Sequence, residues 1–173
     1  MALIGKRPFG LYLHWPFCLA KCPYCDFNSH VSASVDFDQF GDALCQEMQY
    51  MASLLPKHKM LSSLFFGGGT PSLMPPELVE RLITYAEELF GFDPDIEITA
   101  EANPTSVEAA KMLDFQRAGV NRVSMGVQSF DDKTLKFLGR KHSSNEALRA
   151  LDMVRSVFNR VSIDLIYATP GQD

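Results

Sequence analysis

Short apolar runs alternate with longer amphipathic stretches along the whole of this sequence. The runs are rich in β-branched and aromatic residues, and most of them stop at a glycine, a proline or a polar residue. Runs of this length with such boundaries are typical of buried β-strands. They predict five strands, at residues 10–15, 61–66, 96–100, 122–127 and 161–166.

Between the runs, apolar residues recur at steps of three and four, the spacing of one face of a helix. We expect Ser106 and Asn145 to cap two of these helices, and Gly91 and Gly119 to end two of them. The expected helices span residues 36–55, 76–90, 106–118, 131–138 and 145–157.

The alternation of strands and helices predicts right-handed βαβ units and a parallel sheet, so the fold class is α/β. We count five such units in a single domain that covers residues 1–173, and the fifth has no helix after its strand. The strand at 161–166 should therefore form an exposed edge of the sheet. Functional residues are expected on the loops that follow the strands, because these loops meet at one rim.

Composition and charge narrow the function classes. The chain is 46% hydrophobic and 21% charged, as in an ordinary globular domain. A formal net charge of -5 argues against a general nucleic-acid binder. No apolar run is long enough for a transmembrane segment, and the first ten residues have no secretory pattern. The cytoplasm is the expected location.

Three cysteines follow the first predicted strand at a C-x3-C-x2-C spacing: Cys18, Cys22 and Cys25. A structural zinc ion would want a fourth protein ligand, whereas a [4Fe–4S] cluster held by three thiolates keeps one iron open for chemistry. The spacing favours the cluster. A zinc-binding module with His14 or His30 as the fourth ligand, a redox pair and unrelated buried thiols are the alternatives.

The remaining cysteine, Cys45, falls inside the first helical pattern and is expected to be a buried, inert thiol. Reduced cysteines fit a reducing compartment, because disulfide formation would destroy a set of three thiol ligands.

Several polar or glycine residues stand at the expected ends of the other strands. The glycines at 67–69 let a ligand approach the backbone closely, or make a tight turn. Glu101, Gln128 and Asp164 end otherwise apolar strands, where an unsatisfied buried polar group costs roughly 1–3 kcal/mol. A ligand, neighbouring backbone or water would satisfy them. Arg140 is either an exposed charge or a bidentate donor to a carboxylate.

Seven segments of the sequence carry a recognisable combination of motifs: YLHWPFC at 12–18, CPYCDF at 22–27, FGGGTPS at 66–72, EANP at 101–104, RVSMGVQSF at 122–130, LGRKH at 138–142 and DLIYATPGQ at 164–172. An aromatic residue, Tyr24, precedes the third cysteine. In this order, the segments resemble the oxygen-independent coproporphyrinogen III oxidase family of radical S-adenosylmethionine (SAM) proteins. The resemblance covers nearly the whole chain.

The resemblance implies a [4Fe–4S] cluster on Cys18, Cys22 and Cys25, with SAM as the second cofactor. It also implies that SAM or the surroundings of the cluster are contacted by Tyr12, Tyr24, Gly68, Gly69, Thr70, Glu101, Gln128, Arg140 and Asp164. The implied fold is a partial parallel (β/α) barrel of the radical SAM type, with about five of the family's six βα units. In the family, a C-terminal domain follows the barrel; it is absent from this sequence.

The family has two main branches, and residues 26–27 separate them. The oxidases usually carry a further cysteine two residues after the third ligand, where this chain has Phe27 after Asp26. The chain therefore resembles the HemW-type branch, heme chaperones that bind heme and transfer it to heme-accepting proteins. The oxidase, which decarboxylates coproporphyrinogen III, is the alternative. The H-N-R-x-x-D type of heme-binding motif expected downstream does not occur in this sequence.

Overall fold

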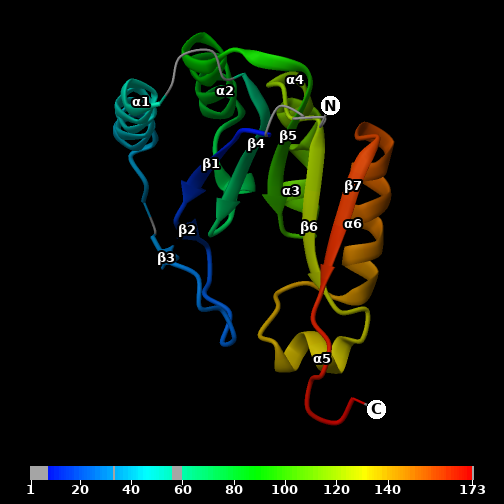
Figure 1. Ribbon diagram of the computed structural model, residues 1–173. Helices are drawn as coiled ribbons and strands as arrows, with labels where there is room; N and C mark the ends of the chain where they lie inside the picture. Colours follow the sequence, from blue (N-terminus) through cyan, green and yellow to red (C-terminus); the bar gives the residue numbers. More distant parts are fainter. Residues whose placement is uncertain (1–7, 33, 56–59, 173) are drawn as a thin grey trace, which may run out of the picture.

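The computed structural model describes residues 8–32, 34–55 and 60–172. Five parallel strands form one sheet in the order β1-β4-β5-β6-β7 (Figure 1). Their bounds are β1 Gly10–Trp15, β4 Leu61–Gly68, β5 Phe92–Ala102, β6 Arg122–Gln128 and β7 Arg160–Leu165. All five strands predicted from the hydrophobic pattern are confirmed.

The helices pack along one side of this sheet (Figure 1). They are α1 Phe37–Leu54, α2 Pro76–Phe90, α3 Ser106–Ala110, α4 Met112–Arg117 and α6 Ser144–Val157, and a short helix, α5 Asp132–Phe137, lies beyond the carboxyl ends of the strands. The α/β class and the partial barrel arrangement expected from the sequence are confirmed.

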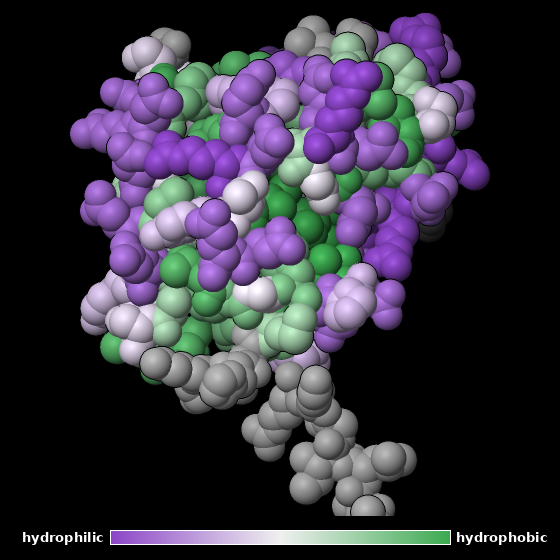
Figure 2. All heavy atoms as spheres, turned by 90° about the horizontal axis from the view of Figure 1, so that it is seen from above, coloured by the Kyte–Doolittle hydropathy of each residue, from purple (hydrophilic) through white to green (hydrophobic). Residues whose placement is uncertain are grey.

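Side chains alternate between the two faces of each strand, and the two faces of the sheet differ in polarity. One face carries Leu13, Leu64, Ile98 and Val123, which are buried against the helices in the hydrophobic core. Seen from above, from the amino ends of the strands, apolar side chains gather in the middle of the molecule with polar ones around them (Figure 2). The core therefore lies between the sheet and its helices.

The other face of the sheet is largely polar. Thr99 pairs in register with Arg122, which pairs with Arg160, so a row of side chains crosses three strands. Arg122 donates hydrogen bonds to Thr99 Oγ1 at 3.2 Å and to Ser162 Oγ at 2.9 Å. This face turns away from the helices and leads toward the carboxyl rim.

Two predicted helix starts are wrong, each by a residue or two. Thr105, not Ser106, caps α3, because its side chain accepts from the backbone N–H of Glu108. Ser143, not Asn145, caps α6 in a reciprocal capping box with Glu146. In both cases a neighbouring residue, nearer the preceding loop, supplies the capping oxygen.

The single helix expected at 106–118 is two helices, because the helix is interrupted at Lys111 between α3 and α4. Gly91 and Gly119 end α2 and α4 as predicted. The hydrophobic pattern did not predict the 3₁₀ turn η1 Pro71–Leu73 or the small sheet of β2 Phe17–Cys18 with β3 His30–Val31. These pieces are too short to carry a period.

Strand β7 lies at one edge of the sheet, and most of its residues are exposed, as expected. Within the described ranges, the structure contains no helix of the length and apolarity that crossing a membrane requires.

Candidate functional site

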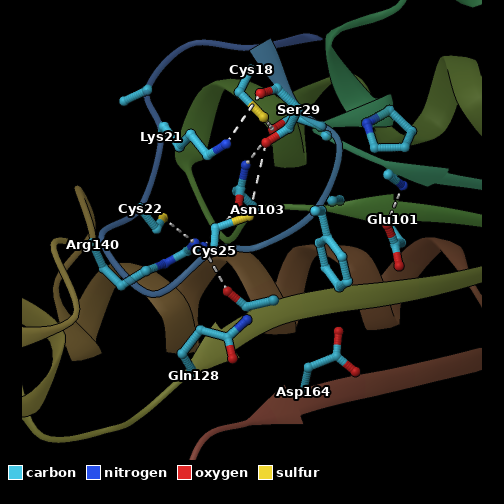
Figure 3. A pocket seen from close by; sticks show the side chains of 18 of the residues that line it. Cys18, Lys21, Cys22, Cys25, Ser29, Glu101, Asn103, Gln128, Arg140 and Asp164 are labelled. Atoms are coloured by element: carbon cyan, nitrogen blue, oxygen red, sulfur yellow. Dashed lines mark hydrogen bonds between the residues drawn. The ribbon is translucent and has the colours of Figure 1, made fainter. Parts of the chain in front are cut away.

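The carboxyl ends of β4, β5, β6 and β7 meet the cysteine loop, which follows β1, at one cavity (Figure 3). The parallel direction of the strands explains this arrangement, because every loop that follows a strand emerges on the same rim. Of the predicted site residues, the cavity is lined by Cys18, Cys22, Tyr24, Cys25, Gly68, Gly69, Thr70, Glu101, Gln128, Arg140 and Asp164.

The cysteine loop is joined to the end of β4 at its start and to itself at its end. At its start, the Trp15 carbonyl accepts from the N–H of Gly69 at 2.6 Å, and the Phe17 carbonyl accepts from the N–H of Thr70 at 2.9 Å. At its end, the N–H of His30 donates to the carbonyl of Pro16 at 2.7 Å. The loop therefore closes on itself, and its thiols are held over the glycines that end β4.

Each of the three thiols has a hydrogen-bond partner from a different segment. Thr70 Oγ1 donates to Cys18 Sγ at 3.5 Å, and Arg140 Nη1 donates to Cys22 Sγ at 3.3 Å. Ser29 Oγ lies 3.8 Å from Cys25 Sγ and is the donor when that sulfur is a thiolate. Such donors stabilise negative charge on sulfur, which metal binding requires.

The described residues contain no ready-made site for a single metal ion. In the part of the chain that the structure describes, no group of three or more histidine, cysteine, aspartate or glutamate side chains could hold one ion. The two candidate fourth ligands of zinc are engaged elsewhere, since His14 Nε2 lies 2.9 Å from the Asn28 carbonyl and His30 Nε2 lies 3.1 Å from Asn28 Oδ1. Neither histidine therefore joins the three thiols in the described structure, and the metal content of the protein decides between zinc and a cluster.

The same cavity contains a buried donor without a partner. The three thiols line one cavity, and Arg140 Nε at its edge is buried without a hydrogen-bond partner among the described residues. A buried guanidinium N–H normally has a partner, so this atom points to an acceptor outside the described residues.

Two glycines at the end of β4 fit only as glycines. Gly68 has φ 115°, in the left-handed range that other residues rarely adopt. A Cβ on Gly69 would lie 2.7 Å from the Phe17 carbonyl oxygen and 2.8 Å from the Pro16 carbonyl carbon. The glycines therefore allow β4 and the cysteine loop to lie close together, and they add no side chains to the cavity.

Glu101 ends β5 on the opposite side of the cavity from Arg140 (Figure 3). The N–H of Gly68 donates to Glu101 Oε2 at 3.1 Å. Burial raises the pKa of Glu101 above 4.5, and the charge of Asp164 raises it further, while the Gly68 N–H and His14 lower it. Asp164 accepts from Ser124 Oγ at 3.3 Å. The cavity thus has carboxylates on one side and cations, Arg140 and Lys21, on the other.

Gln128 holds its position through an unusual backbone. It has φ 70°, although it is not glycine, and its carbonyl accepts from the N–H of Ile166 at 2.9 Å. Such conformations cost free energy and cluster at functional sites. This one turns the amide side chain of Gln128 to the cavity at the end of β6 (Figure 3).

Arg140 is a half-buried donor rather than an exposed charge. Its Nη2 donates to Asn103 Oδ1 at 2.7 Å and to the Gly126 carbonyl at 2.8 Å, and its Nη1 also reaches Tyr24 Oη at 3.4 Å. None of the partners described is a carboxylate, so the predicted bidentate contact would have to be made with a ligand.

Two sequence predictions fare less well. Tyr12 does not line the cavity; its ring stacks on Phe65 with centroids 5.9 Å apart, so its role toward SAM stays a prediction. Cys45 is half-buried rather than buried, and it lies beside Arg81 and Asp42 between α1 and α2. Burial raises the pKa of the Cys45 thiol, in keeping with an inert role.

The sequence analysis did not name Asn103, Ser124 and Gly126 as site residues, although all three line the cavity. Asn103 stands in the segment 101–104 directly after β5, so the end of that strand already places it at the rim. Ser124 and Gly126 stand in the segment 122–130, but which residues of that segment face the cavity depends on the register of β6 against its neighbours.

Comparison with known proteins identifies the family of this chain over nearly its whole length. A sequence model of the Radical SAM superfamily matches residues 12–173. The chain is 41% identical over 172 residues to "Heme chaperone HemW" of Escherichia coli K12, covering 98% of this chain and 45% of that protein. It is 40% identical over 169 residues to the bovine "Radical S-adenosyl methionine domain-containing protein 1, mitochondrial", covering 97% of this chain and 38% of that protein.

A solved structure agrees with these relatives. Coproporphyrinogen III oxidase (HemN) from Escherichia coli, described as a radical SAM enzyme, superimposes with a TM-score of 0.84 at 35% identity, over 96% of this chain and 39% of that one. The chain spans less than half the length of these relatives. Because one of them is mitochondrial, the cytoplasmic location stays a prediction.

Proposed function

Because this chain belongs to the Radical SAM superfamily, we propose that Cys18, Cys22 and Cys25 hold a [4Fe–4S] cluster and that SAM binds beside it. The observation that carries this proposal is the set of three thiols on one cavity, each with its own hydrogen-bond partner. Three thiolates leave one iron without a protein ligand, and a second cofactor can take that place.

In this proposal, residues of the chain bind SAM and hold it in a fixed orientation. The buried Nε of Arg140 is free to donate to the carboxylate of SAM. Glu101 and Asp164, on the other side, favour its positively charged groups and hydroxyls. Gly68 and Gly69 allow close contact with the backbone. The bound cofactors supply one-electron chemistry, and the protein supplies orientation and exclusion of water.

Within the superfamily we propose the heme-chaperone branch, in which heme is bound and passed to an acceptor protein. Two facts support this choice: the 41% identity to the heme chaperone HemW of Escherichia coli, and Phe27 at the position where the oxidases usually have cysteine. Phe27 is 67% exposed and lines the cavity. The likeness to the oxidase structure keeps porphyrinogen decarboxylation as the second candidate.

Anaerobic reconstitution with iron and sulfide tests the cluster. We expect a brown protein with about four irons per chain. Cys22→Ala should abolish the cluster, whereas Cys45→Ala, the matched control on α1, should leave the iron content unchanged. Retention of one zinc per chain without iron–sulfur absorption, or equal loss in the two variants, would overturn the ligand assignment.

A second experiment separates the two branches. The reconstituted protein is incubated with SAM and coproporphyrinogen III, and in parallel with heme followed by a heme-free acceptor protein. The proposal predicts heme binding and transfer without a decarboxylated porphyrin. Cluster-dependent decarboxylation without heme transfer would reverse the ranking.

A further inference from the structure

Asn103, at the start of the loop between β5 and α3, occupies a central place among the polar contacts of the site. Its Oδ1 accepts from Arg140 Nη2 at 2.7 Å, and its Nδ2 donates to Thr70 Oγ1 at 3.4 Å. Figure 3 shows this side chain between the cysteine loop and Arg140. One amide therefore joins two segments that are distant in the sequence.

Both partners of Asn103 are donors to cysteine sulfur. Thr70 Oγ1 donates to Cys18 Sγ at 3.5 Å, and Arg140 Nη1 donates to Cys22 Sγ at 3.3 Å. A hydroxyl has a single proton, so when Thr70 donates it to the sulfur, any other hydrogen bond of this hydroxyl must be one that its oxygen accepts. The Nδ2 of Asn103 is that other donor, and it aims the Thr70 proton at Cys18.

The orientation of the Asn103 amide is determined by its neighbours. Arg140 has only donors, so the oxygen of the amide must face it, and the nitrogen must then face Thr70. Exchanging the oxygen and the nitrogen would place two donors against each other at 2.7 Å.

Glu108 holds the backbone of Asn103 from behind. It is 4% exposed, and its Oε2 accepts from the N–H of Asn103 at 2.8 Å and from the hydroxyl of Ser72. Its Oε1 accepts from Thr105 Oγ1 at 3.3 Å. A buried carboxylate with three donors fixes the loop after β5 to the loop after β4, so the amide of Asn103 has little freedom to move.

We propose that Asn103 is a positioning residue that sets the reduction potential of the cluster by aiming Thr70 at Cys18 and Arg140 at Cys22. The proposal rests on the cluster assignment made above. Hydrogen bonds to the thiolate sulfurs withdraw electron density and favour the reduced cluster, which carries more negative charge. Loss of the amide should therefore make reduction harder.

The test is an anaerobic redox titration of the reconstituted full chain, with iron content measured on the same samples. Asn103→Ala should keep the iron content of the wild type and shift the midpoint potential to a more negative value. Asn145→Ala, an exposed asparagine on α6, is the matched control and should leave the potential unchanged. Both substitutions are neutral for neutral, so no change of charge contributes.

A double-mutant cycle gives a reading that a merely structural role would not produce. Thr70→Val removes the hydroxyl and keeps the shape, so it should also shift the potential to more negative values. If Asn103 acts through Thr70, the shift in the double variant is smaller than the sum of the two single shifts. Additive shifts, or an unchanged potential in Asn103→Ala at full iron content, overturn the inference. A wild-type chain that takes up no iron would instead overturn the cluster assignment itself.

Discussion

Arg140 Nη1 and Cys22 Sγ lie 3.3 Å apart although the two residues are separated by 118 positions in the sequence. The contact joins the loop after α5 to the cysteine loop. The same guanidinium reaches Tyr24, Asn103 and the Gly126 carbonyl, so one side chain connects the cysteine loop, the loop after β5 and strand β6.

This geometry predicts the effect of Arg140→Lys. An ammonium group cannot make the forked set of contacts that a guanidinium makes, and it has no second nitrogen to offer to a carboxylate. We expect SAM to bind at least roughly tenfold more weakly, a loss of about 1.4 kcal/mol, with the iron content retained. Isothermal calorimetry on the reconstituted protein measures this affinity. Arg149→Lys, on the exposed side of α6, should bind as the wild type does, and equal affinities in all three proteins would exclude the role.

From the burial of Glu101 we expect the free energy of unfolding to depend on pH. Burial raises its folded-state pKa above 4.5, so the folded chain keeps the proton at a pH where the unfolded chain has lost it. The free energy of unfolding of the wild type should therefore fall as the pH rises from about 4.5 through the folded-state pKa. Glu101→Gln can still accept from Gly68, and it does not titrate. Urea unfolding measured from about pH 4 to about pH 8 should show a smaller decline in the variant, whereas parallel curves would remove the assignment.

From the positive φ of Gln128 we expect glycine to be tolerated better than alanine at this position. At φ 70°, alanine keeps the backbone strain while glycine relieves it. Both variants lose the side chain, yet Gln128→Gly should be more stable than Gln128→Ala by about 0.5–1 kcal/mol, measured as urea midpoints. At the exposed helical position Gln46 the order should reverse, with glycine about 1 kcal/mol less stable than alanine. The same order at both positions would contradict a strained backbone at Gln128.

Glu108 predicts a large loss of stability for a residue outside the proposed cofactor contacts. Glu108→Ala leaves the hydroxyl of Ser72 and the N–H of Asn103 without their acceptor in a buried place. We expect the free energy of unfolding to fall by about 1–3 kcal/mol for these unsatisfied donors, and by less in Glu108→Gln. Glu80→Ala, at an exposed position of α2, should change it by under about 0.5 kcal/mol. A neutral Glu108→Ala would show that these bonds are not needed.

The sequence was sufficient to predict all five strands and the order of the helices. Both follow from local properties of the chain, namely the spacing of apolar residues and the glycines or prolines that end an element. It placed the cysteines, glycines and strand-end polar residues at one rim, because parallel strands allow no other arrangement. What it could not provide were the contacts between loops. The bond of Asn103 to Thr70, the burial of Glu108 and the register that brings Ser124 to Asp164 depend on tertiary packing. The helix caps at Thr105 and Ser143 were missed because several adjacent residues could each serve as caps.

The most direct test of the account is the electron paramagnetic resonance spectrum of the reduced, reconstituted protein with and without SAM. If three thiolates leave one iron open, SAM becomes a ligand of that iron and the spectrum changes on its addition. The 5′-methylthioadenosine analogue, which lacks the amino and carboxylate groups, should leave the spectrum as it was. The account predicts a change with SAM alone. An identical spectrum at saturating SAM would mean that no iron is open to this ligand, and would contradict the proposed function of the site.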